Sequence, residues 1–560
     1  MANVDMHTIY WRGAVIESGR GRTRVMSDHN TLVPISRLPE CLLTDIFILV
    51  RDIEHASSSS PPCLHVSHVC RAWRDAALQC SLLWTDILFR PPEWTAVMLH
   101  RARTAPLTVN VSIHSLDIGF LNSLRLALSH IRHIRFLSIR LCLMFYGSLD
   151  HLLYPLKSDS PDILEDIRIE CTPRCPCYFD PPFKIAPKLR RSELARCHTD
   201  WNLFYSVGHL TSLVLNLKYT PVSSRLSIEN FLFVLQSMNK LETLALTDAL
   251  PELPMTVRTL PPPQDIVPVR LEHLSHLSLS GYVLDCANFM RYIVMPRCRH
   301  VRLEAEARWS LHEIALAVSP LSNLISSIFD ESDEQKVHYY GDIQQTYHNQ
   351  IDIKFQPFLG AGYTVYARLI WCPPHTGTIM DTSPGFGSLL LALPLDLITG
   401  FRATLSYVAG EHIHSTEWLG VMRRLSHVQR VELSGGYTYD FVNAFHEAHA
   451  SLLPPSNGLD TAILPDLASL TIEHAHFSFP LGDNQLYSTL TRSLTWRQQL
   501  QLPVPIIVLQ SCHITPRQLA TLNLLTPKVV ECTGEPETWG VGELDDESSG
   551  EDNSEDGDED

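Results

Sequence analysis

The chain has 560 residues, of which 45% are hydrophobic, and its formal net charge is −17. That length exceeds one compact core, so we expect several domains or one array of repeats, and the hydrophobic content argues against general disorder. Eleven acidic residues and no basic ones lie between Glu543 and Asp560, so the remaining residues carry only −17 + 11 = −6. A nearly balanced body gives no sign of a nucleic-acid-binding face, and we expect no nucleic-acid partner.

The cysteines and the apolar runs bear on location. Fourteen cysteines are scattered without a regular framework or a signal peptide ahead of them. We interpret them as reduced thiols in a protein of the cytoplasm, the nucleus or both. The most apolar run, residues 386–401, is shorter than the roughly 20 residues that a membrane span needs. The sequence therefore predicts no membrane partner.

The N-terminal residues 1–33 are polar, contain several arginines and show no sustained hydrophobic period. We expect a disordered leader there. Two alternatives stay open, a mitochondrial presequence and an upstream start that is not always used, with Met26 as the other start.

Residues 34–90 predict two short amphipathic helices separated by a polar insertion at residues 52–62. Pro39 suits the first position of a helix, because its ring fixes φ and its missing N–H is not needed there. Apolar stripes follow, formed in the first helix by Leu43, Ile46, Phe47 and Val50, and in the second by Val66, Val69, Cys70, Trp73, Ala76, Ala77 and Cys80. Two helices of this size carry more large apolar residues than they can bury against each other, so we expect a docking module.

This segment resembles an F-box, particularly those of large fungal F-box families. The resemblance rests on an ordered set of motifs: Leu38-Pro39, Leu43 with Ile46-Phe47, Val69-Cys70-Arg71-x-Trp73-Arg74, and Leu83-Trp84. The long insertion between the helices departs from the family pattern, although a longer loop should be tolerated. The resemblance implies that the adaptor-binding residues are Leu38, Pro39, Leu43, Ile46, Phe47, Val69 and Trp73. Some of these seven must instead pack the two helices against each other.

Residues 91–535 predict an irregular leucine-rich-repeat solenoid. Residues 107–113 alternate between apolar and polar, which indicates a half-buried strand. A motif of the form L-x-x-L-x-L, the strand signature of leucine-rich repeats, then recurs. The matches are Ile134/Leu137/Ile139, Leu164/Ile167/Ile169, Leu210/Leu213/Leu215, Leu241/Leu244/Leu246, Leu274/Leu277/Leu279, Cys298/Val301/Leu303, Val428/Val431/Leu433, Leu467/Leu470/Ile472 and Val504/Ile507/Leu509. The central residues of the first six are 24 to 46 positions apart.

Helical stretches are expected between these strands, at residues 120–130, 228–238, 285–294 and 441–452. The alternative is that a leucine-rich α/β protein produces such matches by chance, and the repeats between residues 311 and 425 are indistinct. The fold class we expect is α/β: a small N-terminal helical F-box, the irregular leucine-rich-repeat solenoid, and a disordered acidic tail at residues 536–560.

In such a solenoid the residues between the core leucines line an open sheet face, which suits protein binding. The candidates for binding an unidentified target protein are Arg140, Arg168, Glu170, His276, His300, Arg302, Arg430 and Glu432. The alternative for each of them is a solvated strand face without a partner.

Several groups of cysteines and histidines partly match metal-binding motifs. Cys171, Cys175 and Cys177 with Cys197-His198 could supply four zinc ligands, but the spacing is not standard and plain thiols are favoured. His446 and His449 are three positions apart, whereas the H-E-x-x-H zinc motif needs four. His412/His414 and His474/His476 are H-x-H pairs for which metal is again the minority interpretation. We expect no metal, no cofactor and no catalytic activity in this chain.

The resemblance to F-box proteins with leucine-rich repeats implies a mechanism. The F-box would bind a Skp-type adaptor, which joins a cullin scaffold carrying the ubiquitin-conjugating enzyme, and the solenoid would hold the target nearby. Catalysis by this chain would then be proximity alone. A protein-interaction scaffold without ligase activity is the main alternative, and a zinc-binding or hydrolytic protein is a third.

Overall fold

The structure is a computed structural model, and the part of the chain that it describes consists of residues 35, 38–54, 62–89, 92–114, 117–142, 160–172, 177–178, 186–198, 204, 208–220, 225–262, 265–307, 313–314, 320, 322–323, 339–347, 350–357, 364–371, 389–405, 415–435, 437–450, 463–475, 477 and 485–532. The expected leader (residues 1–33), the acidic tail (residues 536–560), Cys175, and the side chains of Cys177, His198, His412, His414, His449 and His476 lie outside it.

Contacts divide the chain into two units. Unit 1 comprises residues 1–254, 263–281 and 291–298, and unit 2 comprises residues 255–262, 282–290 and 299–560. The expected F-box therefore falls in the same unit as the first repeats. The predicted domain boundaries themselves stay predictions.

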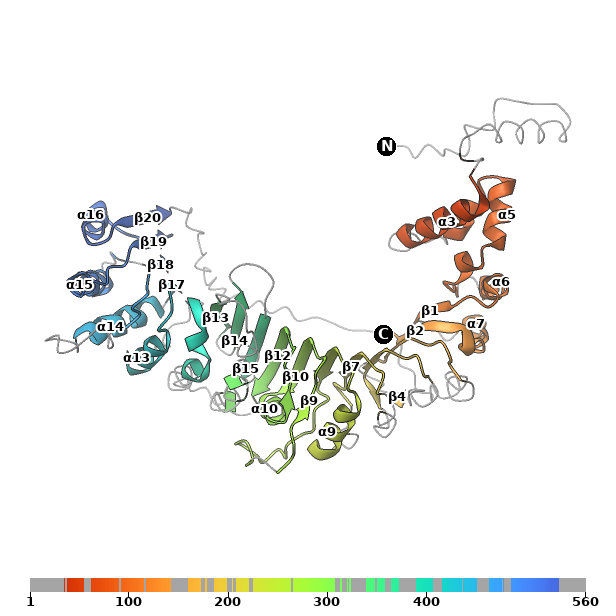
Figure 1. The fold of residues 1–560 in the computed structure, drawn as a ribbon, viewed down its shortest axis with the longest axis horizontal. Helices are drawn as coiled ribbons and strands as arrows, with labels where there is room; N and C mark the ends of the chain where they lie inside the picture. Colours follow the sequence, from red (N-terminus) through yellow and green to blue (C-terminus); the bar gives the residue numbers. More distant parts are fainter. Residues whose placement is uncertain are drawn as a thin grey trace, which may run out of the picture. The chain divides into compact units, whose positions relative to one another are not determined.

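Unit 1 begins with helices (Figure 1). These are α3 (Glu40–Glu54), α4 (Pro62–Ser67), α5 (Arg71–Gln79), the short 3-10 helix η2 (Ser81–Trp84) and α6 (Pro92–Ala102). The carbonyl of Pro39 accepts the N–H groups of Leu42 and Leu43, so α3 begins directly after the proline, one position later than predicted. The expectation of one continuous second helix was wrong, because the chain leaves the helix at His68–Cys70 and the thiol of Cys70 then caps α5 by accepting the N–H of Trp73 at 3.4 Å.

The first helices enclose a small core of their own. The rings of Phe47 and Trp73 lie 5.0 Å apart, and Phe47 is fully buried. Trp84 is also fully buried, and its indole N–H donates to the carbonyl of Ala77 at 2.8 Å. The aromatic residues that carry the F-box resemblance therefore hold the helices together.

The sheet strands of unit 1 are all parallel and follow the order β1, β2, β3, β5, β7, β8, β10. Their bounds are β1 Leu107–Ile113, β2 Ile134–Leu141, β3 Asp166–Glu170, β5 Arg191–Ala195, β7 Ser212–Asn216, β8 Thr243–Thr247 and β10 His276–Tyr282. Two small pairs accompany them, β4 (Cys177–Tyr178) with β6 (Cys197–His198), and β9 (Val269–Arg270) with β11 (Ile293–Val294). Helices α7 (Ile118–Leu128) and α9 (Ile228–Ser237) and the 3-10 helix η3 (Ile131–His133) lie between strands.

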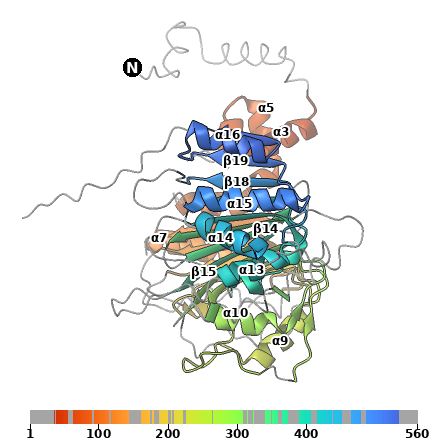
Figure 2. The same cartoon turned by 90° about the vertical axis from the view of Figure 1, so that its left-hand side faces the viewer.

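Unit 2 has the strand order β12, β15, β14, β13, β16, β17, β18, β19, β20. The bounds are β12 His300–Ala307, β13 Tyr339–Tyr347, β14 Gln350–Pro357, β15 Thr364–Trp371, β16 Ile398–Leu405, β17 Arg430–Ser434, β18 Ser469–Glu473, β19 Ile506–Gln510 and β20 Lys528–Cys532. The helices are α10 (Val283–Met290), α13 (Ser415–Arg424), α14 (Tyr437–Ala450), α15 (Gln485–Gln499), α16 (Pro516–Leu525) and the 3-10 helix η7 (Leu395–Leu397). Helices α13 to α16 stack side by side along one face of β17 to β20 (Figures 1 and 2).

All nine predicted L-x-x-L-x-L matches end on a strand, and every one of their apolar side chains is buried. Their central residues also pair in register from strand to strand: Leu213 faces Leu244, and Leu244 faces Leu277. In unit 2, Val431 pairs with Leu470 and Leu470 with Ile507. The expectation of a repetitive parallel sheet with one buried face is therefore confirmed.

Two backbone features repeat with the same period. The residue four positions after the central core residue has a positive φ at Arg196, Asp248, Gly281, Gly435, His474 and Ser511. Its N–H donates to the next strand, as Asp248 does to Ser280 at 2.7 Å. One position further, Cys197 and Cys512 direct their thiols to the carbonyls of Ile169 and Ile472 on the preceding strand. Leucine-rich repeats place asparagine or cysteine at this position.

The indistinct region between residues 311 and 425 contains an antiparallel insertion. Strand β15 pairs in parallel with β12, then antiparallel with β14, which pairs antiparallel with β13, and β13 pairs in parallel with β16. Three consecutive strands therefore enter the sheet in reversed order. Their alternating apolar residues, such as Ile351, Ile353 and Phe355, are buried as in the other strands.

The helix expectations were met in part. Helices α7, α9 and α14 lie close to the predicted 120–130, 228–238 and 441–452. The helix expected at 285–294 instead spans Val283–Met290, because the chain re-enters a strand at Ile293. Helices α6, α13, α15 and α16 were not predicted.

Candidate functional site

The first candidate surface is the apolar face of α3, which consists of Leu42, Ile46, Leu49 and Ile53. These residues recur at intervals of four, three and four, so they share one side of the helix. Leu42, Leu49 and Ile53 are 46%, 60% and 72% exposed, and Ile46 is half-buried. The apolar face of α3 is a solvent-exposed stripe adjacent to the stripe that holds the helices together.

The adaptor-binding residues inferred from the resemblance divide into three groups. Leu43 and Phe47 are buried and cannot form part of an exposed surface. Trp73, Leu38 and Ile46 are half-buried, and Trp73 packs on Phe47. Pro39 and Val69 are exposed. Sequence reasoning missed Leu42, Leu49, Ile53 and Leu82, although the apolar spacing of the first three in α3 could have shown them.

Arg51 attaches α3 to the segment of residues 82–86, which follows the helices. Its guanidinium donates to the carbonyl of Leu82 at 2.5 Å and lies 3.5 Å from the carboxylate of Asp86. Asp86 forms a parallel bridge with Thr108 of β1, and the N–H of Ile87 donates to the Thr108 carbonyl. The segment that contains Asp86 and Ile87 therefore pairs with β1, the first strand of the sheet, and covers part of its otherwise open edge.

The second candidate surface is the strand face that carries the predicted target-binding residues. All eight lie on strands, outside the buried face: Arg140 on β2, Arg168 and Glu170 on β3, His276 on β10, His300 and Arg302 on β12, and Arg430 and Glu432 on β17. Glu170 and Glu432 are half-buried and the other six are exposed. His276 lies in unit 1 and His300 in unit 2.

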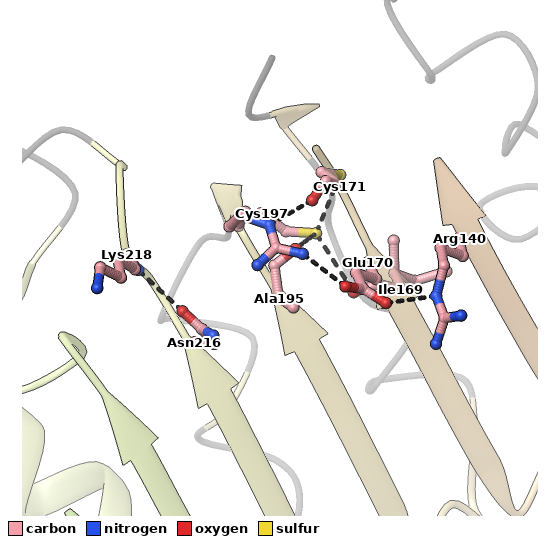
Figure 3. A network of polar contacts seen from close by, with 9 residues as sticks. Arg140, Ile169, Glu170, Cys171, Ala195, Cys197, Asn216 and Lys218 are labelled. Carbon is pink, nitrogen blue, oxygen red and sulfur yellow. Dashed lines mark hydrogen bonds and ion pairs between the residues drawn. The ribbon is translucent and has the colours of Figure 1, made fainter. Parts of the chain in front are cut away.

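In unit 1 the structure places three of these residues in two ion-pair clusters on neighbouring strands, Arg140 and Glu170 in one and Arg168 in the other, and Figure 3 draws the first cluster. Glu170 accepts Nε of Arg140 through Oε2 and Nη2 of Arg196 through Oε1, both at 2.6 Å. Asp166 lies beneath Arg168, at 3.2 Å, and beneath Arg191, at 3.3 Å. Burial alone would raise the pKa of Glu170, but the hydrogen bonds from Arg140 and Arg196 outweigh it, so this pKa is lowered.

In unit 2 a network surrounds Glu432. Tyr340 of β13 donates its hydroxyl to Glu432 at 2.7 Å, and Arg402 of β16 contacts Glu473 at 3.1 Å. Burial raises the pKa of Asp342 on β13, and burial together with the bond to Glu432 raises the pKa of Tyr340. The tyrosine therefore stays protonated as the donor. Neither Tyr340 nor Arg402 was predicted, because neither precedes or follows a recognisable repeat leucine.

The cysteine cluster differs from the expectation of reduced thiols at one position. Cys171 is disulfide-bonded. Cys197 is a free, buried thiol 3.4 Å from the Cys171 sulfur, and burial raises its pKa to about 12. In the part of the chain that the structure describes, no group of three or more His, Cys, Asp or Glu side chains is arranged to hold a metal ion.

His446 lies on α14 with its ring 5.2 Å from that of Trp496. Burial and the nearby Arg492 lower its pKa.

None of the described helices is both long enough and apolar enough to cross a membrane.

Comparisons with known proteins give little further information. No family model matches the chain, and no curated protein matches it. A crystal structure of a TLR13–ssRNA13 complex is similar over 76% of this chain, with 11% identity and a TM-score of 0.28. This chain spans 45% of that TLR13 chain, less than half of its length. Such a TM-score supports no conclusion, but the repeat-like parallel sheet described above is compatible with leucine-rich repeats.

Proposed function

We propose that this chain is the substrate-recognition subunit of a Skp–cullin–F-box ubiquitin ligase. In this proposal the helices of residues 34–90 bind a Skp-type adaptor and the strand faces bind a target protein. The chain itself contributes no reacting group, since the ubiquitin-conjugating enzyme on the cullin scaffold performs the chemistry. Its contribution is a raised effective concentration of the target.

The observation that carries the proposal is the concentration of exposed apolar side chains in the first helices. Six of the fourteen exposed large hydrophobic residues in the described part of the chain lie between Ile35 and Leu82. They are Ile35, Leu42, Leu49, Ile53, Val69 and Leu82. Exposed apolar residues gathered in this way indicate a protein-binding surface rather than the scattered ones of an ordinary monomer.

A helix with one exposed apolar face binds a partner by laying that face into an apolar groove. Covering a side chain such as Ile53 contributes on the order of 1–2 kcal/mol. Arg51 holds α3 against the segment that caps the first strand, so the apolar face of α3 is presented on a fixed support. Its rigidity lowers the entropic cost of binding.

The proposed location is the cytoplasm, the nucleus or both. Eight described cysteines are free thiols, which supports a reducing compartment even though Cys171 is disulfide-bonded.

The test is co-purification with a Skp-type adaptor after substitution of the apolar face of α3. We expect Leu49→Asp with Ile53→Asp to abolish adaptor binding without unfolding the chain, because both side chains are already exposed. Ile118→Asp is the matched control, since Ile118 is 75% exposed at the start of α7, outside this surface. A second variant, Leu38→Ala with Pro39→Ala, should also weaken binding. Leu43 and Phe47 are unsuitable, because changing a buried residue would damage the fold.

Adaptor binding that survives both variants would refute the proposal. Adaptor binding without cullin in the purified complex would favour the alternative, a protein-interaction scaffold that assembles no ligase.

A further inference from the structure

Unit 1 carries a pair of Arg–carboxylate–Arg triads on adjacent strands. In one, Glu170 is held between Arg140 and Arg196, and in the other, Asp166 is held between Arg168 and Arg191. The two carboxylates occupy the ends of the same short strand, β3, while the arginines come from β2, from β3 itself, from β5 and from the residue after β5. Each triad has a net charge of +1.

The charges in these triads are arranged with the cations outermost. The side chains of Arg140, Arg168 and Arg191 are 63%, 45% and 63% exposed, and these three residues are called the arginine patch below. The carboxylates beneath them are less exposed, Asp166 at 6% and Glu170 at 38%. A molecule that approaches this face therefore meets guanidinium groups first.

The carboxylates fix the guanidinium groups without using all of their donors. Arg140 donates its Nε–H to Glu170, and the printed contact of Arg191 with Asp166 is also made by Nε, at 3.3 Å. Figure 3 shows the terminal nitrogens of Arg140 pointing away from Glu170. Arg168 is further held over the ring of Phe136, 5.3 Å from its centre. Such fixed forks are suited to bidentate binding of an anionic group.

The neighbouring strands leave room for an extended ligand. On the same face, β7 and β8 present small or short side chains: Ser212, Val214, Asn216, Thr243, Ala245 and Thr247. An extended peptide could lie across these strands without meeting a bulky residue, while its side chains reach the arginine patch.

We infer that the arginine patch binds a segment of the target protein that is rich in aspartate and glutamate. The inference rests on the proposed function, in that the occupant is the recruited target. The argument is charge complementarity. The four arginines of the two triads and the three carboxylates of Asp166, Glu170 and Glu193 together carry a net charge of +1, and the arginines of the patch are exposed. Arg190, which is also exposed directly before β5, adds a further positive charge.

A protein segment fits this surface better than a nucleic acid does. Glu193 lies 3.7 Å from Arg168 and is 46% exposed, so an acid interrupts the patch where a continuous phosphate backbone would pass. The aromatic ring on these strands, Phe136, is covered by Arg168 and cannot stack with a base. Spaced carboxylates can avoid Glu193, whereas evenly spaced phosphates cannot.

The test is fluorescence anisotropy with the full-length chain and a fluorescein-labelled dodecapeptide that alternates glutamate and serine. A peptide with glutamine in place of glutamate is its matched control. We expect binding of the glutamate peptide that weakens as salt rises from about 50 to about 200 mM, and no binding of the glutamine peptide. Arg140→Gln with Arg168→Gln should weaken binding about tenfold, because one fork is lost from each triad. Each carboxylate keeps its second arginine, so the fold should persist, which a thermal melt checks.

Arg125→Gln is the control variant, because Arg125 is an exposed arginine of unit 1 that lies on helix α7 and not on the strand face of the arginine patch. It should leave the affinity unchanged. Equal binding of the glutamate and glutamine peptides, or an unchanged affinity in the double variant, would overturn the inference. Tighter binding of poly(U) RNA than of the glutamate peptide would overturn it in favour of a nucleic acid, and binding that appears only after the peptide serines are phosphorylated would overturn it in favour of a phosphate ligand.

A last arm addresses the chain's own acidic residues. A full-length variant with amides in place of the eleven acids of 543–560 should bind the peptide as the parent does. A severalfold gain in affinity would mean that this segment is the occupant, and would overturn the assignment to a target. Because no arm involves the adaptor, these results are independent of adaptor binding. A chain that binds the peptide but not the adaptor would support the arginine patch and refute the ligase proposal. A chain that binds the adaptor but not the peptide would support the ligase proposal and refute the inference about the arginine patch.

Discussion

The hydroxyl of Tyr340 donates a hydrogen bond to the carboxylate of Glu432 at 2.7 Å, across a strand that lies between them. Tyr340 is on β13 and Glu432 on β17, and β16 separates the two. The bond is possible because Tyr340 pairs with Gly400 of β16, where no side chain stands in the way of the ring. A Cβ on Gly400 would lie 2.5 Å from Cδ2 of Tyr340.

Gly400→Val should therefore displace the tyrosine ring and break its bond to Glu432. We expect a loss of about 1–3 kcal/mol in the free energy of unfolding, as for other overpacked sites. Chemical denaturation measures it. Tyr340→Phe, which removes the hydroxyl alone, should cost about 0.5–1.5 kcal/mol. In a Tyr340→Ala background Gly400→Val should cost much less, and a cost that persists there would show that the ring is not the obstacle.

The parallel strands were predictable because their signal is local. In the L-x-x-L-x-L pattern, apolar residues stand three positions before and two positions after the central leucine. This pattern predicts a strand with one buried face, and its recurrence predicts which residues of neighbouring strands pair. Strand β5, one of those that were missed, shows the limit of that signal. Its central position is Ser192, which is 1% exposed, so the L-x-x-L-x-L pattern is broken there although Leu189 and Leu194 are buried. Among the first six central residues the longest interval, from 167 to 213, is the sum of two ordinary ones, 25 and 21, because Ser192 of β5 lies between them.

The reversed order of β13, β14 and β15 could not be predicted in this way. Alternation shows that a strand has two different faces, but it does not show which neighbour the strand pairs with or in which direction.

The same limit applies to the apolar face of α3. The helix has two adjacent apolar stripes, and only packing against α5 decides that Leu43 and Phe47 turn inward while Leu49 and Ile53 stay exposed. The candidate residues on the strand face were found from the repeat register, but their partners across strands, such as Tyr340 and Arg196, required the fold.

Cys197 should be inert to alkylation in the folded chain. Its side chain is fully buried and its pKa is raised to about 12, so almost no thiolate exists near neutral pH. Mass spectrometry after iodoacetamide treatment at pH 8 should show rapid modification of the exposed Cys41 and Cys142, and modification of Cys197 only after unfolding. Equal rates at the three positions would contradict the buried repeat position assigned to Cys197.

Arg497 should be essential to the stability of unit 2. This arginine is fully buried in α15, and it donates to the carbonyls of Leu502, Ile463 and Leu464 at 2.9 to 3.0 Å. Leu464 has a φ of 51°, a conformation that costs a leucine of order 1–3 kcal/mol and is held by such bonds. Burial lowers the pKa of Arg497 to about 10, so it remains charged at neutral pH.

Arg497→Met would leave three buried carbonyls without this donor, and we expect a loss of about 2–4 kcal/mol in denaturant unfolding. Arg492→Met is the control on the same helix. Arg492 is exposed, so its replacement should change stability by no more than about 0.5 kcal/mol. A similar effect of the two substitutions would show that the buried bonds of Arg497 contribute little.

His446 should make the stability of unit 2 fall in mild acid. Burial, then the charge of Arg492, hold its pKa below the ordinary value of 6.5, while Glu447 acts weakly in the opposite sense. The unfolded chain therefore takes up a proton at a higher pH than the folded chain does. The stabilisation is complete above pH 6.5 and is lost as the pH falls through the lower, folded pKa. Unfolding free energies at pH 7.5 and 5.5 should differ less in His446→Gln than in the parent chain. Arg492→Gln should reduce the difference by a smaller amount, because burial, the larger cause, remains. An identical pH dependence in the parent chain and in His446→Gln would exclude this histidine as the titrating group.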